Sequence, residues 1–259
     1  MSDTSSPSNR FDTPTTTHFG FDEIETSQKA GAVEQLFSAV APKYDLMNDL
    51  MSGGVHRLWK AALIDWIMPK PGQRFLDMAG GTGDVADAIR QAAGGPDVPG
   101  EVLVADLTQA MLDEGQKRFE GRDDLSWQCC NAEELPFEAN SFDVYTISFG
   151  LRNVARPERA LAEANRVLKP GGRFFCLEFS QVVLPVFDKI YDAYSFNVLP
   201  KIGGLVANDE ESYRYLVESI RRFPNQQVLE DMMVQAGFKR VEHRNYSGGI
   251  AAIHKGVKI

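Results

Sequence analysis

The sequence predicts an α/β fold with a doubly wound, mostly parallel sheet, and three observations support this. Short apolar runs alternate with amphipathic segments of helical spacing along most of the chain. The first run, 74–78, leads into a glycine-rich turn, and the second, 101–106, ends in an acid about 20 residues beyond that turn. This alternation is typical of βαβ units, which place ligands at the carboxyl ends of parallel strands. With 259 residues, 43% of them hydrophobic, we expect one large domain.

The turn Ala79-Gly80-Gly81-Thr82-Gly83 follows the first strand and precedes a helix expected over 85–92. Glycines allow positive φ and a close approach of the backbone to a ligand, and the first amides of the helix are unpaired donors. The spacing of Gly81, Gly83 and Ala86 also satisfies the dinucleotide pattern. Asp77 discriminates between cofactors, because its charge disfavours a pyrophosphate. The same charge can hold the ammonium group of S-adenosylmethionine, directly or through water.

The second and third strands are expected over 101–106 and 125–130. The carboxylate of Asp106 at the end of the second strand is placed to accept ribose hydroxyls. In an alternative interpretation, Asp106 is a solvated acid or part of the N-cap region of the helix that begins near Thr108. After the third strand, the junction at Asn131 and Ala132 offers donors and acceptors for an adenine edge.

The fourth strand, 142–148, opens into Phe149-Gly150-Leu151-Arg152-Asn153. Apolar residues of 157–168 recur on one helical face, with a proline in the first turn. The segment 169–172 stops this helix, and 173–179 is the fifth strand. We expect the ligands to meet outside the carboxyl ends of the first and fourth strands.

Helices are expected before and after this core. Apolar faces recur over 33–40 and 55–67, and the polar, aromatic and Met-rich segment 42–54 between them suits a lid over a flat substrate. An aromatic-rich cap insertion covers 182–223. The chain then predicts a helix over 226–236 and a closing hairpin from 241–246 and 249–254, which adds one antiparallel edge strand.

Composition excludes several classes of function. The net charge of −9, without a basic run, argues against nonspecific nucleic-acid binding and against an electrostatic membrane anchor. No apolar stretch of about 18 residues is present. Residues 1–28 lack the features of a signal peptide and predict a disordered leader to a cytosolic protein. The three cysteines and four histidines show no metal-ligand spacing, so we predict no metal. Acids do not cluster after the fourth strand, as a metal-dependent O-methyltransferase requires.

Two sets of motifs carry a family resemblance. The phrases L-D-x-A-G-G-T-G-D, the acid Asp106, N-A-E-x-L-P-F and L-K-P-G-G-R resemble class I S-adenosylmethionine-dependent methyltransferases over about residues 70–180. Four flanking phrases look like the ubiquinone/menaquinone biosynthesis C-methyltransferase family, which extends the resemblance from Thr17 to Ile259; they are Tyr44 to Asp49, Ser148 to Asn153, Tyr191 to Phe196 and Val206 to Asp209. The departures are mild, namely the Gly/Pro-rich loop 94–100 and Cys130 before Asn131.

The resemblance implies a Rossmann-like, seven-stranded methyltransferase fold and S-adenosyl-L-methionine as the cofactor. It implies methylation of a ring carbon of a prenylated quinol, either 2-polyprenyl-6-methoxy-1,4-benzoquinol or demethylmenaquinol or both. Besides the quinol, the expected partners are a membrane surface, through peripheral contact, or other enzymes of the quinone pathway. No nucleic-acid partner is expected. The expected cofactor-binding residues are Asp77, Gly81, Thr82, Gly83, Asp106, Asn131, Ala132 and Ser148.

Arg152, Asn153 and Tyr44 are the catalytic candidates. A quinol hydroxyl must lose its proton to push electron density onto the ring carbon, and the Arg152 guanidinium can stabilise the phenolate or position a water that takes the proton. Asn153 can orient the ring oxygen or Arg152, and Tyr44 can hydrogen-bond to the quinol or stack on it. The alternatives are a structural ion pair for Arg152 and packing or capping roles for the other two.

The prenyl tail has a candidate surface in 44–51 and 183–199, where six apolar residues recur at helical spacing; they are Leu184, Phe187, Ile190, Tyr191, Tyr194 and Val198. The alternative is that this stripe belongs to the core. Two further classes stay open at this point, an NAD-dependent oxidoreductase and a noncatalytic S-adenosylmethionine-binding protein. The expected organisation is a leader at 1–28 and a single domain at 29–259, with N-terminal helices at 29–68, a cofactor-binding core at 70–180, the cap at 182–223 and a C-terminal helix and hairpin at 226–259.

Overall fold

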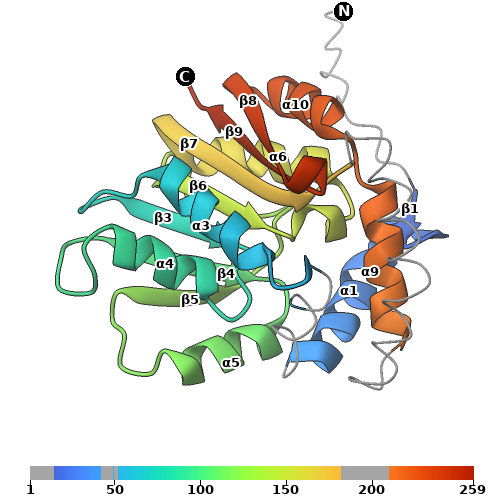
Figure 1. The fold of residues 1–259 in the computed structure, drawn as a ribbon, viewed down its shortest axis with the longest axis horizontal. Helices are drawn as coiled ribbons and strands as arrows, with labels where there is room; N and C mark the ends of the chain where they lie inside the picture. Colours follow the sequence, from blue (N-terminus) through green and yellow to red (C-terminus); the bar gives the residue numbers. More distant parts are fainter. Residues whose placement is uncertain (1–14, 42–48, 50–51, 182–209) are drawn as a thin grey trace, which may run out of the picture.

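The computed structural model describes residues 15–41, 49, 52–181 and 210–259. A seven-stranded sheet forms its centre (Figure 1). The strand order is β5-β4-β3-β6-β7-β9-β8. The strands are β3 (Arg74–Met78), β4 (Glu101–Asp106), β5 (Leu125–Cys129), β6 (Phe142–Ser148), β7 (Leu168–Phe179), β8 (Lys239–Tyr246) and β9 (Ala251–Val257). Strands β3 to β7 are parallel, and the chain reverses its direction of winding between β3 and β6. Ligands of doubly wound sheets bind at such a switch point.

The position of the antiparallel strand corrects the sequence prediction. Strand β9 is antiparallel to both β7 and β8, and it lies between them, so the sheet edge is formed by β8. Most residues of β9 are buried, whereas β8 alternates exposed and half-buried residues. The more apolar strand therefore takes the inner position, where both of its edges are paired and its side chains leave water.

Helices cover both faces of the sheet. They are α1 (Thr26–Val40), α3 (His56–Ile67), α4 (Asp84–Ala92), α5 (Gln109–Arg118), α6 (Pro157–Val167), α9 (Glu210–Arg222) and α10 (Gln226–Gln235). Alternate residues of the central strands enter two separate hydrophobic clusters. One cluster holds the buried faces of α3 and α4, and the other holds those of α6 and α10. Strands with both faces buried explain the nearly continuous apolar runs of the sequence.

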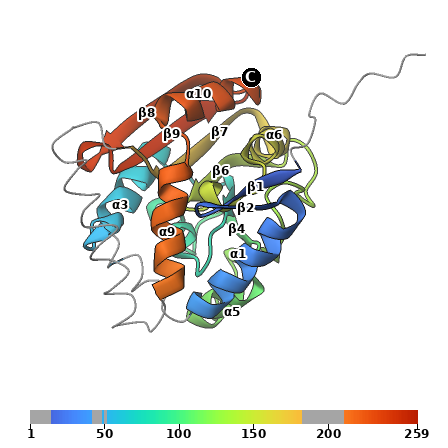
Figure 2. The same cartoon turned by 90° about the vertical axis from the view of Figure 1, so that its right-hand side faces the viewer.

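The end of the expected disordered leader is instead ordered. Thr16–Phe19 (β1) and Asp22–Glu25 (β2) form an antiparallel hairpin that leads into α1, and Figure 2 shows this hairpin beside α9. The Phe19 ring stacks on Tyr215 with centroids 4.2 Å apart. The Thr17 hydroxyl donates to the carbonyl of Ala155 (3.2 Å), and the Phe21 amide donates to Glu218 (3.0 Å). These partners lie more than 130 residues away, so local composition does not reveal them.

Two predicted segments fall wholly or partly outside the described residues. Within these two segments, the residues outside the description are 42–48 and 50–51 of the lid segment and 182–209 of the cap insertion. The tail-binding stripe and Tyr44 therefore stay predictions. The described end of the cap segment forms α9.

The loop 94–100 is held by a buried arginine on α4. Arg90 is fully buried, its Nε donates to Asp124 (2.8 Å), and its Nη2 donates to the carbonyls of Gly95 (2.7 Å) and Val98 (2.8 Å). Arg122 also pairs with Asp124, and the hydrogen bonds from Arg122 and Arg90 lower the pKa of that carboxyl to about 2. The Gly/Pro-rich departure from the family pattern is thus tied to the core.

We predict that Arg90→Met lowers the free energy of unfolding by about 3 kcal/mol, because it leaves the carbonyls of Gly95 and Val98 without this donor and removes one partner of a buried ion pair. Urea denaturation monitored by circular dichroism measures the change. Lys117→Met serves as the control, since Lys117 forms an exposed pair with Glu114. Equal midpoints for Arg90→Met and wild type would contradict the proposed role of Arg90.

Candidate cofactor and acceptor site

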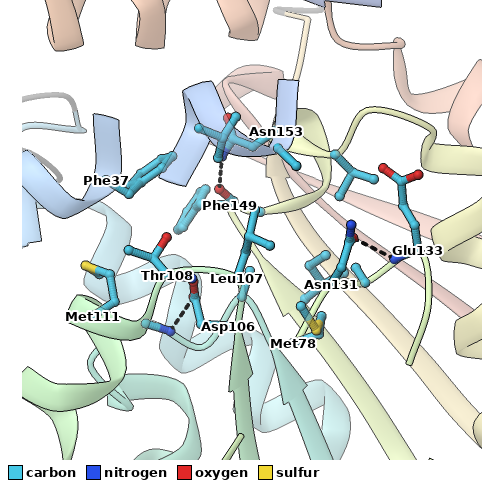
Figure 3. A pocket seen from close by; sticks show the side chains of 18 of the residues that line it. Phe37, Met78, Asp106, Leu107, Thr108, Met111, Asn131, Glu133, Phe149 and Asn153 are labelled. Carbon is cyan, nitrogen blue, oxygen red and sulfur yellow. Dashed lines mark hydrogen bonds between the residues drawn. The ribbon is translucent and has the colours of Figure 1, made fainter. Parts of the chain in front are cut away.

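Two adjoining cavities lie at the carboxyl ends of β3, β4 and β6. The larger, of about 690 Å³, is lined from the sheet side by Met78, Asp106 and Ile147 and is covered by Val33 and Phe37 of α1. Figure 3 shows Phe37 and Asn153 projecting toward this cavity from the side opposite Asp106. The smaller, of about 330 Å³, is lined by Lys60, Asp77, Ala79, Gly80, Thr82, Asp84, Val85, Ser148 and Phe149. Ala79 and Phe149 line both cavities.

Asp106 lines the larger cavity and also holds two loops. Its Oδ2 accepts from the Gly81 amide (3.0 Å) and its Oδ1 from the Thr108 amide (2.9 Å). Thr108 immediately precedes α5, so the alternative capping interpretation of Asp106 describes one of its contacts. Burial raises the pKa of Asp106, although these backbone donors oppose the shift. Each carboxylate oxygen has two lone pairs, so each can accept a further hydroxyl from the cavity.

Asn131 and Ala132 line the same cavity. The Oδ1 of Asn131 accepts the Glu133 amide at 2.9 Å, and Figure 3 shows this bond at the cavity wall. This bond fixes the orientation of the Asn131 amide group, so that its nitrogen is available as a donor.

The glycine turn brings its backbone between the two cavities. Gly81 and Gly83 have φ values of 54° and 87°, in the left-handed region that favours glycine. A Cβ at Gly83 would lie 2.8 Å from the Trp127 ring, and one at Gly81 would lie 3.0 Å from Met111. Side chains at these positions would strain the turn, so its backbone conformation favours glycine.

Asp77 is the most constrained acid of the site. It is fully buried, its Oδ1 accepts the Thr146 hydroxyl at 2.7 Å, and its Oδ2 has no hydrogen-bond partner among the described residues. The buried hydroxyl of Ser148, which lines the same small cavity, also lacks one there. Burial raises the pKa of Asp77 to about 7, opposed by the Thr146 hydrogen bond and the charge of Lys60. An unsatisfied carboxylate oxygen and an unsatisfied hydroxyl beside a cavity fit an ammonium donor.

We predict that Asp77→Asn gains stability relative to wild type as pH rises. Because the folded pKa exceeds the unfolded one, wild type pays a growing penalty between about pH 4 and pH 7, which stays constant above. Asparagine keeps the acceptor for Thr146 and does not ionise. The stability of the variant relative to wild type should therefore increase by about 2 to 3 kcal/mol between pH 5 and pH 8. Urea denaturation at both pH values measures this, and a constant difference would contradict it.

Arg152 lies in a buried ion pair. Its Nη1 donates to Glu178 Oε2 (2.8 Å), and its backbone amide donates to Oε1 of the same carboxylate (3.2 Å). Arg152 also donates to the carbonyl of Phe149. It does not line either of the two cavities, but it borders a third one, which shares Val154 and Ala155 with the larger. The structural ion pair that the sequence offered as an alternative role for Arg152 is therefore present.

Asn153, unlike Arg152, lines the larger cavity. Its Nδ2 donates to the Phe149 carbonyl (3.4 Å), and its Oδ1 accepts the Tyr215 hydroxyl of α9 (3.0 Å). Both contacts orient the amide at the cavity wall. The third catalytic candidate, Tyr44, lies outside the described residues.

Sequence reasoning missed Glu133, Glu178 and Lys60 as residues of the site. Glu133 is 3% exposed and lines the larger cavity, where it accepts the amides of Ala155 (3.1 Å) and Arg156 (3.2 Å). Its position inside the N-A-E-x-L-P-F phrase was the available signal. Glu178 and Lys60 carry no such signal, because their partners Arg152 and Asp84 are distant in sequence.

Comparisons with known proteins agree with this geometry. The sequence profile of the ubiE/COQ5 methyltransferase family matches residues 24–258. The chain belongs to this family. The ubiquinone/menaquinone biosynthesis C-methyltransferase UbiE of Cereibacter sphaeroides (strain ATCC 17029) is 55% identical over 251 residues, which cover 96% of this chain and 99% of that protein. The UbiE of Ruegeria sp. (strain TM1040) is 54% identical over 247 residues, covering 94% and 97%. The family predicted from the motifs is confirmed.

Solved structures confirm the predicted fold class. A methyltransferase of Thermotoga maritima, described as S-adenosylmethionine-dependent and as a possible histamine N-methyltransferase, superposes with a TM-score of 0.63 at 19% identity, covering 87% of this chain and 99% of that chain. A chain of the Haloferax volcanii complex between the Trm112 methyltransferase activator and a putative methyltransferase gives 0.61 at 18% identity, covering 85% and 96%.

Two searches of the described residues were negative. In that part of the chain, no helix has both the length and the apolar character needed to cross a bilayer. No group of three or more His, Cys, Asp or Glu side chains there is arranged to hold a metal ion.

Proposed function

We propose that this protein is an S-adenosylmethionine-dependent C-methyltransferase that acts on a prenylated quinol ring in ubiquinone/menaquinone biosynthesis. The observation that carries this proposal is membership of the ubiE/COQ5 family, with relatives of that name at 52–55% identity over nearly the whole chain. The acceptor is 2-polyprenyl-6-methoxy-1,4-benzoquinol or demethylmenaquinol or both. The decisive test is product formation from radiolabelled S-adenosylmethionine with each quinol, and a noncatalytic binding protein would form neither product.

The two cavities divide the proposed cofactor between them. Asp106, Asn131 and Ala132 would hold the adenosine part, and the backbone of Gly81, which lines the same cavity, would allow its close approach. The smaller cavity would hold the amino-acid part, since Asp77 and Ser148 offer an unsatisfied acceptor and hydroxyl beside Thr82. An ammonium group there would stabilise the ionised form of Asp77 and offset the cost of burying its charge. When bound, S-adenosylmethionine supplies an activated methyl group.

The larger cavity has room for a flat ring beside the cofactor. Apolar side chains of Val33, Phe37, Phe149 and Val154 line it and suit an aromatic ring. In the proposed reaction, the ring carbon would bond to the methyl carbon as the carbon–sulfur bond breaks and its electron pair goes to sulfur, and the proton of the ring carbon would then leave to water. The chain must therefore orient the ring, exclude water and favour loss of the quinol hydroxyl proton.

We assign the orientation of the ring oxygen to Asn153, because its amide lies at the cavity wall and is held by Phe149 and Tyr215. Arg152 acts from behind this wall as a source of positive potential for the phenolate, and its ion pair with Glu178 weakens that potential. Arg152 thus contributes to catalysis without touching the quinol. We assign the acceptance of the quinol hydroxyl proton to a water. Tyr44 stays a proposed quinol contact.

Cytoplasmic location with peripheral membrane contact completes the proposal. A prenyl chain must lie against protein or lipid, and each buried CH₂ contributes up to about 0.8 kcal/mol. The predicted tail surface lies largely outside the described residues.

We predict that Asp106→Ala weakens S-adenosylmethionine binding by roughly 2 to 4 kcal/mol, because a buried carboxylate makes charge-assisted hydrogen bonds to ribose hydroxyls. Wild type should not bind NAD, since the negative charge of Asp77 at the turn opposes a pyrophosphate. Calorimetric titration with both ligands measures these affinities. Glu114→Ala, on α5 and outside both cavities, is the control, since the Glu114 side chain is 44% exposed. Unchanged affinity in Asp106→Ala, or NAD binding by wild type, would refute the cofactor assignment.

We predict that Asn153→Ala lowers kcat about 10- to 100-fold and leaves S-adenosylmethionine affinity nearly intact, because the amide acts on the acceptor. Arg152→Lys should lower kcat as well, because lysine keeps the charge but lacks the guanidinium that holds Glu178 and the Phe149 carbonyl, and so fixes the wall that carries Asn153. Arg152→Ala is less informative, because it strands the buried Glu178 carboxylate. Steady-state turnover with calorimetric cofactor titration measures both quantities, and wild-type kcat in either variant would remove that residue from the mechanism.

A further inference from the structure

A third cavity, of about 520 Å³, lies between the N-terminal hairpin, the loop after η2 (Leu151–Asn153) and α9. Its lining residues are Thr17, His18, Gly20, Lys29, Arg152, Val154, Ala155, Pro157, Tyr215, Ser219, Arg222, Phe223 and Pro224. The lining contains three basic residues, Lys29, Arg152 and Arg222, and a histidine, and it contains no acid. This is unusual in a chain with a net charge of −9.

Lys29 is the main feature of this cavity. Its side chain is 5% exposed, and its one hydrogen bond among the described residues goes to the Val154 carbonyl (3.0 Å). An ammonium group carries three donors, and a buried lysine without a salt bridge is costly. No salt bridge within 4.0 Å is formed by Lys29 in the described part of the chain, although Glu133 lies near enough to act on its charge. Burial lowers the pKa of Lys29 to about 8, so it remains mostly cationic at neutral pH.

Three acidic residues near this cavity, Glu178, Glu133 and Glu218, interact with other groups. Glu178 pairs with Arg152, and Glu133 contacts Arg156 on the other side of the loop. Glu218 accepts the Phe21 amide and lies 4.0 Å from Arg214. Arg222 forms no ion pair among the described residues and rests over the Phe21 ring. Its guanidinium and the Lys29 ammonium are therefore not neutralised, and the buried Nε of Arg152 has no hydrogen-bond partner there.

We propose that this cavity binds a phosphate-class oxyanion, held by Lys29 and Arg222 with the Arg152 guanidinium behind them. Phosphate oxygens suit this donor set, because a guanidinium can bind two of them and an ammonium a third. The oxyanion comes either from a free phosphate compound or from a lipid headgroup. Val154 and Ala155 line both this cavity and the larger cavity, which is the proposed acceptor cavity. An ion bound here therefore contacts the wall of the acceptor cavity.

The test is calorimetric titration of the full chain with inorganic phosphate at pH 7 and constant ionic strength, without cofactor or quinol. Its result is therefore independent of the methyl-transfer assay. Wild type should show saturable binding, and Arg222→Gln and Lys29→Met should each weaken it about tenfold or more, the loss expected for one charge-assisted hydrogen bond. Arg222 is exposed, so Arg222→Gln should fold even if Lys29→Met does not. Arg214→Gln, on the same helix and outside the cavity, is the matched control and should bind like wild type.

The two sources of the oxyanion are separated by sedimentation with phosphatidylcholine vesicles, with and without phosphatidylglycerol. Weaker binding of Arg222→Gln than of Arg214→Gln to the anionic vesicles assigns the site to a lipid headgroup. Equal vesicle binding by these two variants, with phosphate binding lost only in Arg222→Gln, assigns it to a free phosphate compound. The proposal is overturned if wild type shows no saturable phosphate binding, or if Arg222→Gln binds phosphate no more weakly than Arg214→Gln.

Discussion

The parallel pairing of β3 with both β4 and β6 is the constraint on which the rest of the structure depends. It sets Asp77 beside Val104 on one side and Thr146 on the other, so the Thr146 hydroxyl reaches the Asp77 carboxylate. The same pairing brings the ends of the three strands, with Asp106 and Ser148, to one edge of the sheet. The chain reverses its winding direction there, and the two cavities lie at this switch point.

A buried carboxylate at this edge lowers the stability of the protein. The raised pKa of Asp77 means that burial makes its ionisation less favourable in the folded chain than in water. A hydrophobic residue would pack at lower cost, but it would not bind an ammonium group. Such a conflict between stability and binding is expected at functional sites. Asp106 avoids much of this penalty, because two backbone amides donate to it.

The segment 149–156 forms the wall between the acceptor cavity and the third cavity, and buried charges hold it from several directions. Glu178 binds its start through Arg152, Glu133 accepts two amides near its end, and Lys29 donates to the Val154 carbonyl. Buried ion pairs add little net stability, but removal of one partner is costly. We infer that these contacts mainly select one conformation of the segment. The N-terminal hairpin contributes through Thr17 and through Phe19, which packs on Tyr215.

The sequence by itself determined the order and type of the core elements and the family. The strand expected over 142–148 has those bounds in the structure, and the glycine turn lies where its spacing placed it. Both were predictable because hydrophobic periodicity and turn-forming residues are local properties of the sequence. Tertiary structure alone decided the inner position of β9, the order of the N-terminal hairpin and the pairing of Arg152 with Glu178. It also decided that Asn153 lines the acceptor cavity while Arg152 lies behind it. Each of these depends on contacts between residues far apart in the chain, and sequence spacing holds no information about which distant groups will satisfy a buried charge.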